Sequence, residues 1–169
     1  MKKELGWAVG VSILFLITGC GIREAIKEDT LYQKVLPYAQ EKQLSVSFET
    51  KAIVNGVYLN PLYPGKFATP TFLVGVYNGC ENNLTGCNFS IKLNGSSPTD
   101  INNTIPNYIL YKTFPFYNNW ANYYIVKFPA VKPPYRLIYS NPDWGKIEMK
   151  WKGKKEGEEC PTPLSQQKK

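Results

Sequence analysis

Short runs in which apolar and polar residues alternate occupy most of the chain, from about residue 44 to residue 152. A period of two is typical of β-strands with one face buried and the other exposed to solvent. Leu44, Val46 and Phe48 begin this pattern, so we expect these three side chains on one buried face. Thr71–Tyr77 is apolar at nearly every position and is therefore predicted to be a central strand.

Clusters of proline, glycine and asparagine separate about seven predicted strands. These strands are expected at residues 44–59, 71–77, 89–93, 108–113, 123–128, 135–140 and 146–152. Within the first range, Asn55-Gly56 is a candidate turn or bend. Residues 94–107 are predicted to form a polar loop, and the last two strands are predicted to form a hairpin around residues 141–145.

The residues before the first strand have a helical period instead. Thr30-Leu-Tyr-Gln33 has the spacing of a capping box, and apolar residues at helical intervals follow it. The spacing predicts a short helix over residues 31–42, which Pro37 should kink or split because proline lacks a backbone N–H.

These elements together predict an all-β sandwich, immunoglobulin-like or transthyretin-like, of about seven strands with one short N-terminal helix. The domain is expected to span residues 30–152. Residues 153–169 lack an apolar period and are predicted to be a disordered tail.

The start of the chain has a pattern of its own. Lys2 and Lys3 precede an apolar run from Trp7 to Ile17, and small residues then lead to Cys20. The run is too short for a membrane-spanning helix of about 20 residues. A charged start, a short apolar run and small residues in this order predict that residues 1–19 are a signal peptide. An ordinary secretory peptide with an incidental cysteine, or an uncleaved anchor, is the alternative.

Ile17-Thr18-Gly19-Cys20 resembles the lipobox of bacterial lipoproteins, with Ile17 where that family more often has leucine. The resemblance implies that Cys20 is diacylated and becomes the first residue of an exported, membrane-anchored protein. Residues 20–29 would then form a lipidated tether, and two or three acyl chains would make the attachment effectively permanent. Because Gly21 rather than aspartate follows the cysteine, the resemblance implies the outer membrane in a diderm host.

Charge adds little to this picture. The chain has a net charge of +7, which becomes +6 without residues 1–19. Its basic residues are scattered until the tail, which is typical of a solvated surface. The alternative is attraction to anionic lipids, wall polymers or an acidic partner. We do not expect an exported chain of this kind to bind nucleic acid.

Catalytic chemistry is poorly supported. The chain contains no histidine, which excludes Ser-His-Asp and Cys-His catalysis and the usual zinc sites with histidine ligands. Between residues 50 and 145 the only acidic residues are Glu81, Asp100 and Asp143, and glycine-rich nucleotide motifs are missing. We therefore expect no catalytic residues, no cofactor and no bound metal, and predict that the protein is not an enzyme.

The remaining cysteines suit a disulfide, since exported chains meet an oxidising environment. Cys80 and Cys87 lie at the end of one predicted strand and the start of the next. If these strands pair as a hairpin, the two Cα atoms come within bonding distance. Two free thiols are the alternative, and a metal site that adds Cys160 would lack a fourth ligand. Cys160 is otherwise either unpaired or bonded to a second chain.

Aromatic residues are concentrated in one segment, residues 114–123. Most aromatic side chains of a sandwich fill its core. The candidate binding residues are Phe116, Tyr117, Trp120 and Tyr123, which are too close in sequence to point in one direction. The segment is thus either a packed corner or an exposed patch for a sugar ring, a peptide or a partner loop.

The plan of a lipid-anchored sandwich is similar to that of the outer-membrane lipoproteins of type VI secretion, the TssJ family. The similarity covers the lipobox, the chain length, and an early strand in which Val54-Asn55 precedes a proline-rich turn. It implies a non-enzymatic envelope protein that docks or stabilises a membrane-associated complex with a protein partner, while no site residue is implied. A module that binds glycan or cell-wall polymer through the aromatic segment is the second hypothesis.

Overall fold

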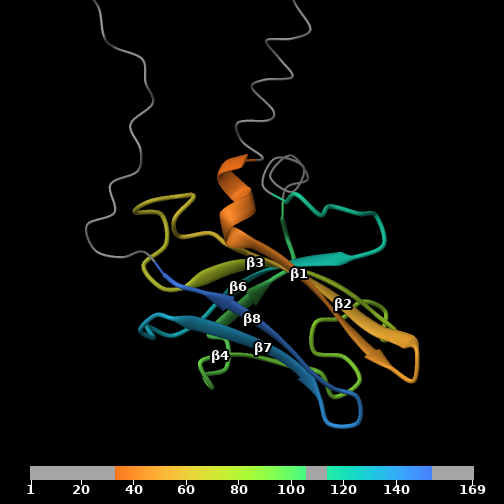
Figure 1. The fold of residues 1–169 in the computed structure, drawn as a ribbon. Coiled ribbons are helices and arrows are strands. Elements are labelled where there is room, and N and C mark those ends of the chain that lie inside the picture. The colour runs from red at the N-terminus through yellow and green to blue at the C-terminus, as the bar shows by residue number, and fades with distance from the viewer. Residues whose placement is uncertain (1–32, 106–113, 154–169) are drawn as a thin grey trace, which may run out of the picture.

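The computed structural model describes residues 33–105 and 114–153 and shows two antiparallel β-sheets packed face to face (Figure 1). The five-stranded sheet has the order β1-β2-β3-β6-β5, and the three-stranded sheet has the order β4-β7-β8. The strands are β1 (Ala39–Val46), β2 (Glu49–Tyr58), β3 (Thr71–Asn78), β4 (Ser90–Leu93), β5 (Asp100–Asn102), β6 (Asn122–Lys127), β7 (Tyr135–Asn141) and β8 (Gly145–Trp151). The predicted all-β sandwich is confirmed.

Several predicted features lie outside the described residues. They are the signal peptide, the lipidation site Cys20, the tether, the strand at 108–113, Cys160 and the tail from residue 154. Within the described residues, no helix is both long enough and apolar enough to cross a membrane.

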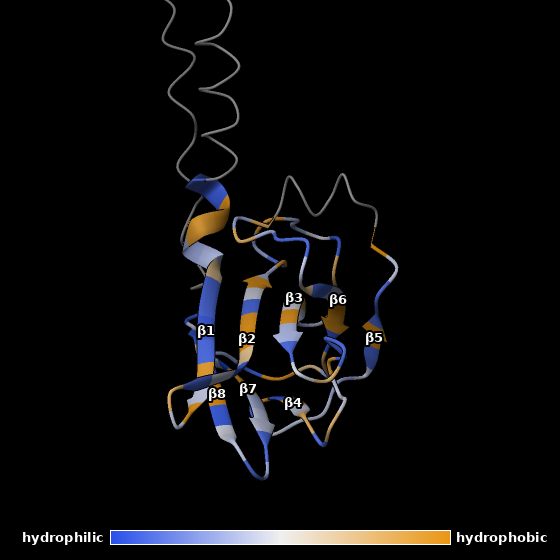
Figure 2. Cartoon of the chain, turned by 90° about the vertical axis from the view of Figure 1, so that its right-hand side faces the viewer, coloured by the Kyte–Doolittle hydropathy of each residue, from blue (hydrophilic) through white to orange (hydrophobic). Residues whose placement is uncertain are grey.

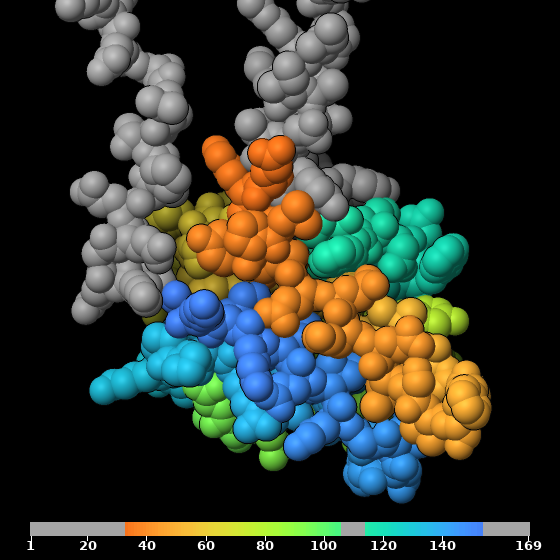
Figure 3. Space-filling model, viewed as in Figure 1, coloured from red at the N-terminus to blue at the C-terminus, as the bar shows by residue number. Residues whose placement is uncertain are grey.

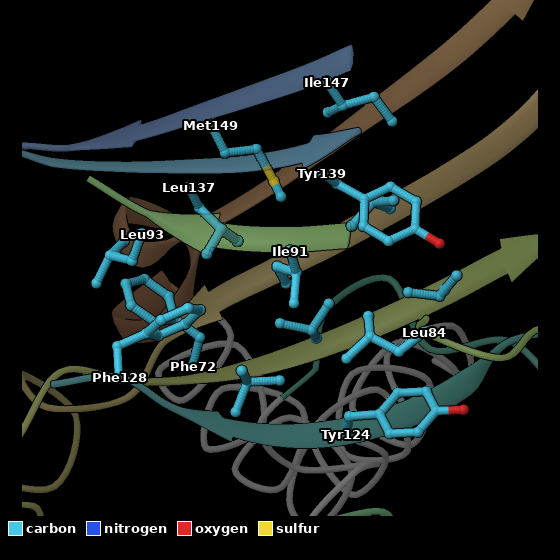
Figure 4. Packing of buried hydrophobic residues seen from close by; sticks show 14 of the residues in the cluster. Phe72, Leu84, Ile91, Leu93, Tyr124, Phe128, Leu137, Tyr139, Ile147 and Met149 are labelled. Atoms are coloured by element: carbon cyan, nitrogen blue, oxygen red, sulfur yellow. The ribbon is translucent and has the colours of Figure 1, made fainter. Parts of the chain in front are cut away.

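The main core lies between the two sheets (Figure 4). Phe72, Val74 and Val76 of β3 face Leu137 of β7 and Met149 of β8, and all five side chains are fully buried. β3 is the middle strand of its sheet and is buried on both faces, because Leu73 belongs to a second cluster on the outer face. The prediction of a central strand at residues 71–77 is therefore confirmed.

The predicted turn at Asn55-Gly56 is wrong, because β2 runs straight through both residues. Gly56 faces the other sheet, and a Cβ atom there would lie 3.2 Å from the Trp151 ring and 3.3 Å from the Met149 sulfur. The glycine thus permits a close approach of the sheets.

The predicted N-terminal helix is present but shorter than expected. Residues 33–35 are α-helical, the 3₁₀-helix η1 (Leu36–Tyr38) follows, and β1 begins at Ala39. Pro37 lies in the first turn of η1, and Ala39 pairs with Val57 of β2. Pairing with the sheet therefore replaces the last turn of the predicted helix. Figure 2 shows β1 as the hydrophilic edge strand of its sheet.

The expected burial of Phe48 is also wrong. β1 and β2 form a tight hairpin in which Val46 pairs with Glu49, so that Ser47 and Phe48 are the two turn residues. Leu44 is buried as predicted, Val46 is half-buried, and Phe48 is fully exposed. The alternation ends at the turn, because the chain reverses there.

β5 lies inside the predicted polar loop and pairs with β6 at the sheet edge. All three of its residues are exposed. A strand without a buried face needs no apolar period, so the sequence does not indicate it. The predicted hairpin of the last two strands is confirmed: β7 pairs with β8 around Pro142, Asp143 and Trp144.

Candidate functional site

Residues 114–121 of the aromatic segment form a loop over the outer face of the five-stranded sheet, and we call this part the aromatic loop. Phe114 and the neighbouring β6 residue Tyr123 are only 3% and 8% exposed and pack with Val57 and Leu73. A Cβ atom on Gly75 of β3 would lie 2.7 Å from the Tyr123 ring, so this glycine makes room for the aromatic rings. Part of the segment is therefore a packed corner.

Phe116 and Tyr117 are half-buried against the same cluster. The Tyr117 ring stacks on the Tyr123 ring with centroids 5.3 Å apart, and the Phe116 ring meets Phe114 edge to face at 6.4 Å. Three of the four candidate binding residues thus contribute to packing, and a ligand would reach only the outer edges of Phe116 and Tyr117.

Trp120 differs from its neighbours, because 74% of it is exposed. Its backbone is nonetheless well held. The Asn118 side-chain oxygen accepts hydrogen bonds from the backbone N–H groups of Trp120 (3.0 Å) and Ala121 (2.8 Å). Such turns, in which an asparagine side chain caps the following backbone, fix a tight loop. The indole ring therefore projects from a defined backbone.

The Tyr123 hydroxyl holds the base of the aromatic loop. It accepts a hydrogen bond from the backbone N–H of Asn118 (2.8 Å) and donates one to the carbonyl oxygen of Asn118 (3.0 Å). Burial raises the pKa of Tyr123 above its ordinary value, and the hydrogen bond to the Asn118 backbone opposes this shift. The phenol therefore stays protonated at neutral pH and keeps its donor role.

A disulfide-closed loop supports the aromatic loop from the side. Cys80 and Cys87 are bonded, with their Cα atoms 5.9 Å apart, as the sequence predicted. Within the closed loop, the Asn82 side chain donates to the Trp120 carbonyl oxygen, and the Asn82 carbonyl accepts from the Tyr124 hydroxyl at 3.1 Å. The disulfide thus lies in the segment that holds Trp120.

The prediction that a hairpin brings the two cysteines together is wrong. β3 and β4 do not form a hairpin, because β3 belongs to the five-stranded sheet and β4 to the three-stranded sheet. The chain crosses between the sheets after Asn78, and successive turns bring the two cysteines together. Glu81, Asn82, Cys87 and Asn88 all have positive φ angles in these turns.

Tyr77 is an exposed aromatic residue near this site that the sequence did not indicate. Its side chain is 45% exposed, and it pairs with the half-buried Ile53 of β2. The preceding residue, Val76, pairs with Asn122 of β6, next to the aromatic loop. The apolar pattern of residues 71–77 suggested burial of both strand faces. The side chains that cover the outer face of the sheet do not reach Tyr77. No local sequence pattern shows where this covering ends.

An open pocket of about 240 Å³ lies beside the aromatic loop. Its lining is mostly polar and includes Asn103, Asn118, Asn119 and Asn122 together with Tyr117 and Tyr123. Amide side chains both donate and accept hydrogen bonds, so the pocket suits an uncharged polar ligand.

Acid–base chemistry is not evident at the site. Among the described residues that line the pocket, none is an aspartate, glutamate, lysine or arginine. In residues 33–105 and 114–153, no three cysteine, aspartate or glutamate side chains are grouped closely enough to hold a metal ion. The arrangement is suited to binding through an aromatic ring and amide groups.

Comparison with known proteins gives no further guide. No family model matches the chain, and no curated protein or solved structure matches it.

Proposed function

We propose that this chain is a lipid-anchored, non-enzymatic envelope protein that docks onto or stabilises a membrane-associated protein complex. The lipobox-like sequence ending at Cys20 supports the anchor, and the lack of histidine supports the non-enzymatic role. The observation that carries the docking role is Trp120, an exposed indole on a backbone that hydrogen bonds hold in place.

A protein partner suits the surroundings of Trp120. Energetic centres of protein interfaces are often tryptophan and tyrosine residues surrounded by a polar rim. Here Trp120 and Tyr77 are exposed, and asparagines such as Asn119 and Asn122 supply exposed polar groups nearby. A rigid loop also loses little conformational entropy on binding. The partner should therefore present an apolar pocket with hydrogen-bonding groups at its edge.

The test compares tagged full-length chains in the native host after chemical cross-linking. Wild type, Trp120→Ala and Ile101→Ala should be expressed at equal levels, and the captured envelope proteins quantified by isotope labelling. Ile101 is a matched control because it is an exposed apolar residue on β5. We expect Trp120→Ala alone to deplete a specific partner by at least about tenfold, the effect of a hot-spot residue worth about 1.4 kcal/mol or more. An unchanged set of partners would exclude this surface.

A second candidate function is glycan or cell-wall binding, and the asparagine-lined pocket favours it. In this function the exposed Trp120 indole stacks on a sugar ring, and the asparagine amides of the pocket bind the hydroxyl groups of that sugar. Co-sedimentation of the full chain with purified sacculi tests this candidate. Binding that falls in both Trp120→Ala and Asn119→Ala would favour the glycan over the protein partner, whereas no binding by the wild type would remove it.

A further inference from the structure

The turn between β1 and β2 carries a residue that does not suit its backbone. Ser47 and Phe48 have φ angles of +50° and +67°, as the two central residues of a type I′ hairpin turn require. Asparagine and glycine are the preferred residues in such turns, and a bulky side chain with positive φ is a conformational outlier. Glycine at position 48 would adopt this conformation without steric cost.

Phe48 is also fully exposed, although the hairpin around it is well ordered by polar contacts. The Gln43 side chain donates to the hydroxyls of Ser45 (2.7 Å) and Thr50 (2.6 Å), and Lys51 pairs with Glu49 at 2.6 Å. The ring therefore projects from a fixed hairpin. A fully exposed apolar ring is common by itself, but a bulky residue kept at a strained backbone position points to a role for its side chain.

An open surface hollow lies beside the β7–β8 turn. It has a volume of about 430 Å³ and is lined mainly by apolar surface, with Ser90, Ser140, Pro142 and Gly145 among its residues. The hydroxyls of Ser90 and Ser140 lie 3.1 Å apart and bond to each other, so they do not require a polar ligand. The hollow is open to solvent and has more volume than one phenyl ring occupies.

The Phe48 turn and the hollow lie at the same end of the molecule. Figure 3 shows the β1–β2 hairpin and the β7–β8 turn side by side, away from the N-terminal helical turn. Lys51 lies 5.4 Å from the Trp144 ring centroid, which joins the two turns. Each chain therefore presents a ring and a hollow together.

Charge favours a second copy of the chain as the occupant. Glu49 and Asp143 balance Lys51 and Lys146 at this end, although the whole chain has a net charge of +7. Two such ends meet without net repulsion, and Glu49 of one copy is complementary to Lys146 at the hollow of the other. A balanced end gives no comparable attraction to an anionic membrane.

We propose that two copies of this protein associate end to end, with Phe48 of each inserted into the hollow lined by Ser90, Ser140, Pro142 and Gly145 of the other. The contact is isologous, because the same surface serves both copies. It does not involve Trp120 and is independent of the function proposed for the aromatic loop.

Photo-crosslinking of the detergent-purified full chain tests the contact. p-Benzoylphenylalanine in place of Phe48 keeps an aromatic side chain and reacts with what surrounds it. We expect a product of twice the chain mass in which position 48 is joined to the tryptic peptide 137–146. Mixing ¹⁵N-labelled and unlabelled chains identifies links between copies. A link within one chain, a link to detergent only, or no product of double mass would overturn the proposal.

Two glycine variants separate the ring from the turn. Phe48→Gly should weaken self-association at least about tenfold in sedimentation velocity, as expected for a central interface residue. Its melting temperature, measured at a dilution at which both proteins are monomeric, should equal or exceed that of the wild type, because glycine adopts the positive φ without steric cost. Ser47→Gly relieves the neighbouring positive φ and keeps the ring, so its self-association should match the wild type. Unchanged association of Phe48→Gly, or loss of association in Ser47→Gly, would contradict the inference.

Discussion

Trp120 and Phe114 belong to the same loop but differ in what surrounds them. Phe114 is buried against Tyr123 with ring centroids 5.0 Å apart, whereas Trp120 is mostly exposed. Trp120→Ala should lower the melting temperature by no more than a few degrees, because little buried surface is lost. Phe114→Ala should lower the free energy of unfolding by about 3–5 kcal/mol, which could unfold a domain of ordinary stability.

Thermal melting of both variants checks this contrast. Equal losses of stability would mean that Trp120 belongs to the core, and the binding role proposed for its ring would then be withdrawn. The native fold of each variant can be verified by circular dichroism before its binding is compared.

The sequence identified the aromatic segment but not the role of each ring. Phe116, Tyr117, Trp120 and Tyr123 have similar local surroundings in sequence. Their burial depends on which rings face Leu73 on the distant strand β3, and a local pattern carries no information on that contact. Phe48 was misjudged for a related reason, since the period of two does not show where a chain reverses.

The Cys80–Cys87 disulfide stabilises the loop that it closes. Cys80→Ser with Cys87→Ser should lower the free energy of unfolding by about 2–3 kcal/mol, because the open loop gains entropy in the unfolded chain. Urea denaturation with and without reductant measures this. Reductant should destabilise the wild type by a similar amount and leave the double variant unchanged. A double variant as stable as the oxidised wild type would contradict the prediction.

The β7–β8 pair gives a pH dependence of known sign. The Arg136 guanidinium, which donates to Glu148 at 2.6 Å, and then the Lys150 ammonium lower the pKa of Glu148 from 4.5 to about 2. The ionised carboxylate is the stabilising form. Its contribution is therefore complete above about pH 4.5 and is lost as the pH falls from there toward 2.

Glu148→Gln removes this titration, so the free energy of unfolding of the variant should fall less steeply than that of the wild type in this pH window. Urea denaturation at successive pH values measures both slopes. High salt should reduce the difference, because the ion pairs are partly exposed. Identical slopes at low salt would show that the pairs are not formed.

Elements were predictable where neighbouring segments pair. The β7–β8 hairpin combines alternation in both strands with a short turn, so the sequence was sufficient to predict it. The helix was predicted too long, because residues 39–42 pair with β2, which lies beyond a turn. β5 has a single apolar residue, Ile101, which is too little to show a period, and the strand is defined by its pairing with β6.

For the molecule as a whole, the number and spacing of the strands predicted two sheets, but not which strands belong to each sheet. β3 and β4 are adjacent in sequence and lie in different sheets. The contact between η1 and β8 is also non-local: the Trp151 indole N–H donates to the Tyr38 carbonyl oxygen at 2.8 Å. Such contacts span more than a hundred residues and depend on the assembled core.

The anchor is the property that would place this molecule in the cell. Cys20→Ser should abolish acylation and move the full chain from the detergent phase to the aqueous phase on phase separation. Leu84-Thr85-Gly86-Cys87 has a similar four-residue pattern, but it lies within the domain and does not follow a charged start and a short apolar run. The melting temperature should not change, since the contacts described for the sandwich belong to residues 33–105 and 114–153. Cys160→Ser is the matched control and should remain acylated. Acylation that persists in Cys20→Ser would refute the lipoprotein assignment.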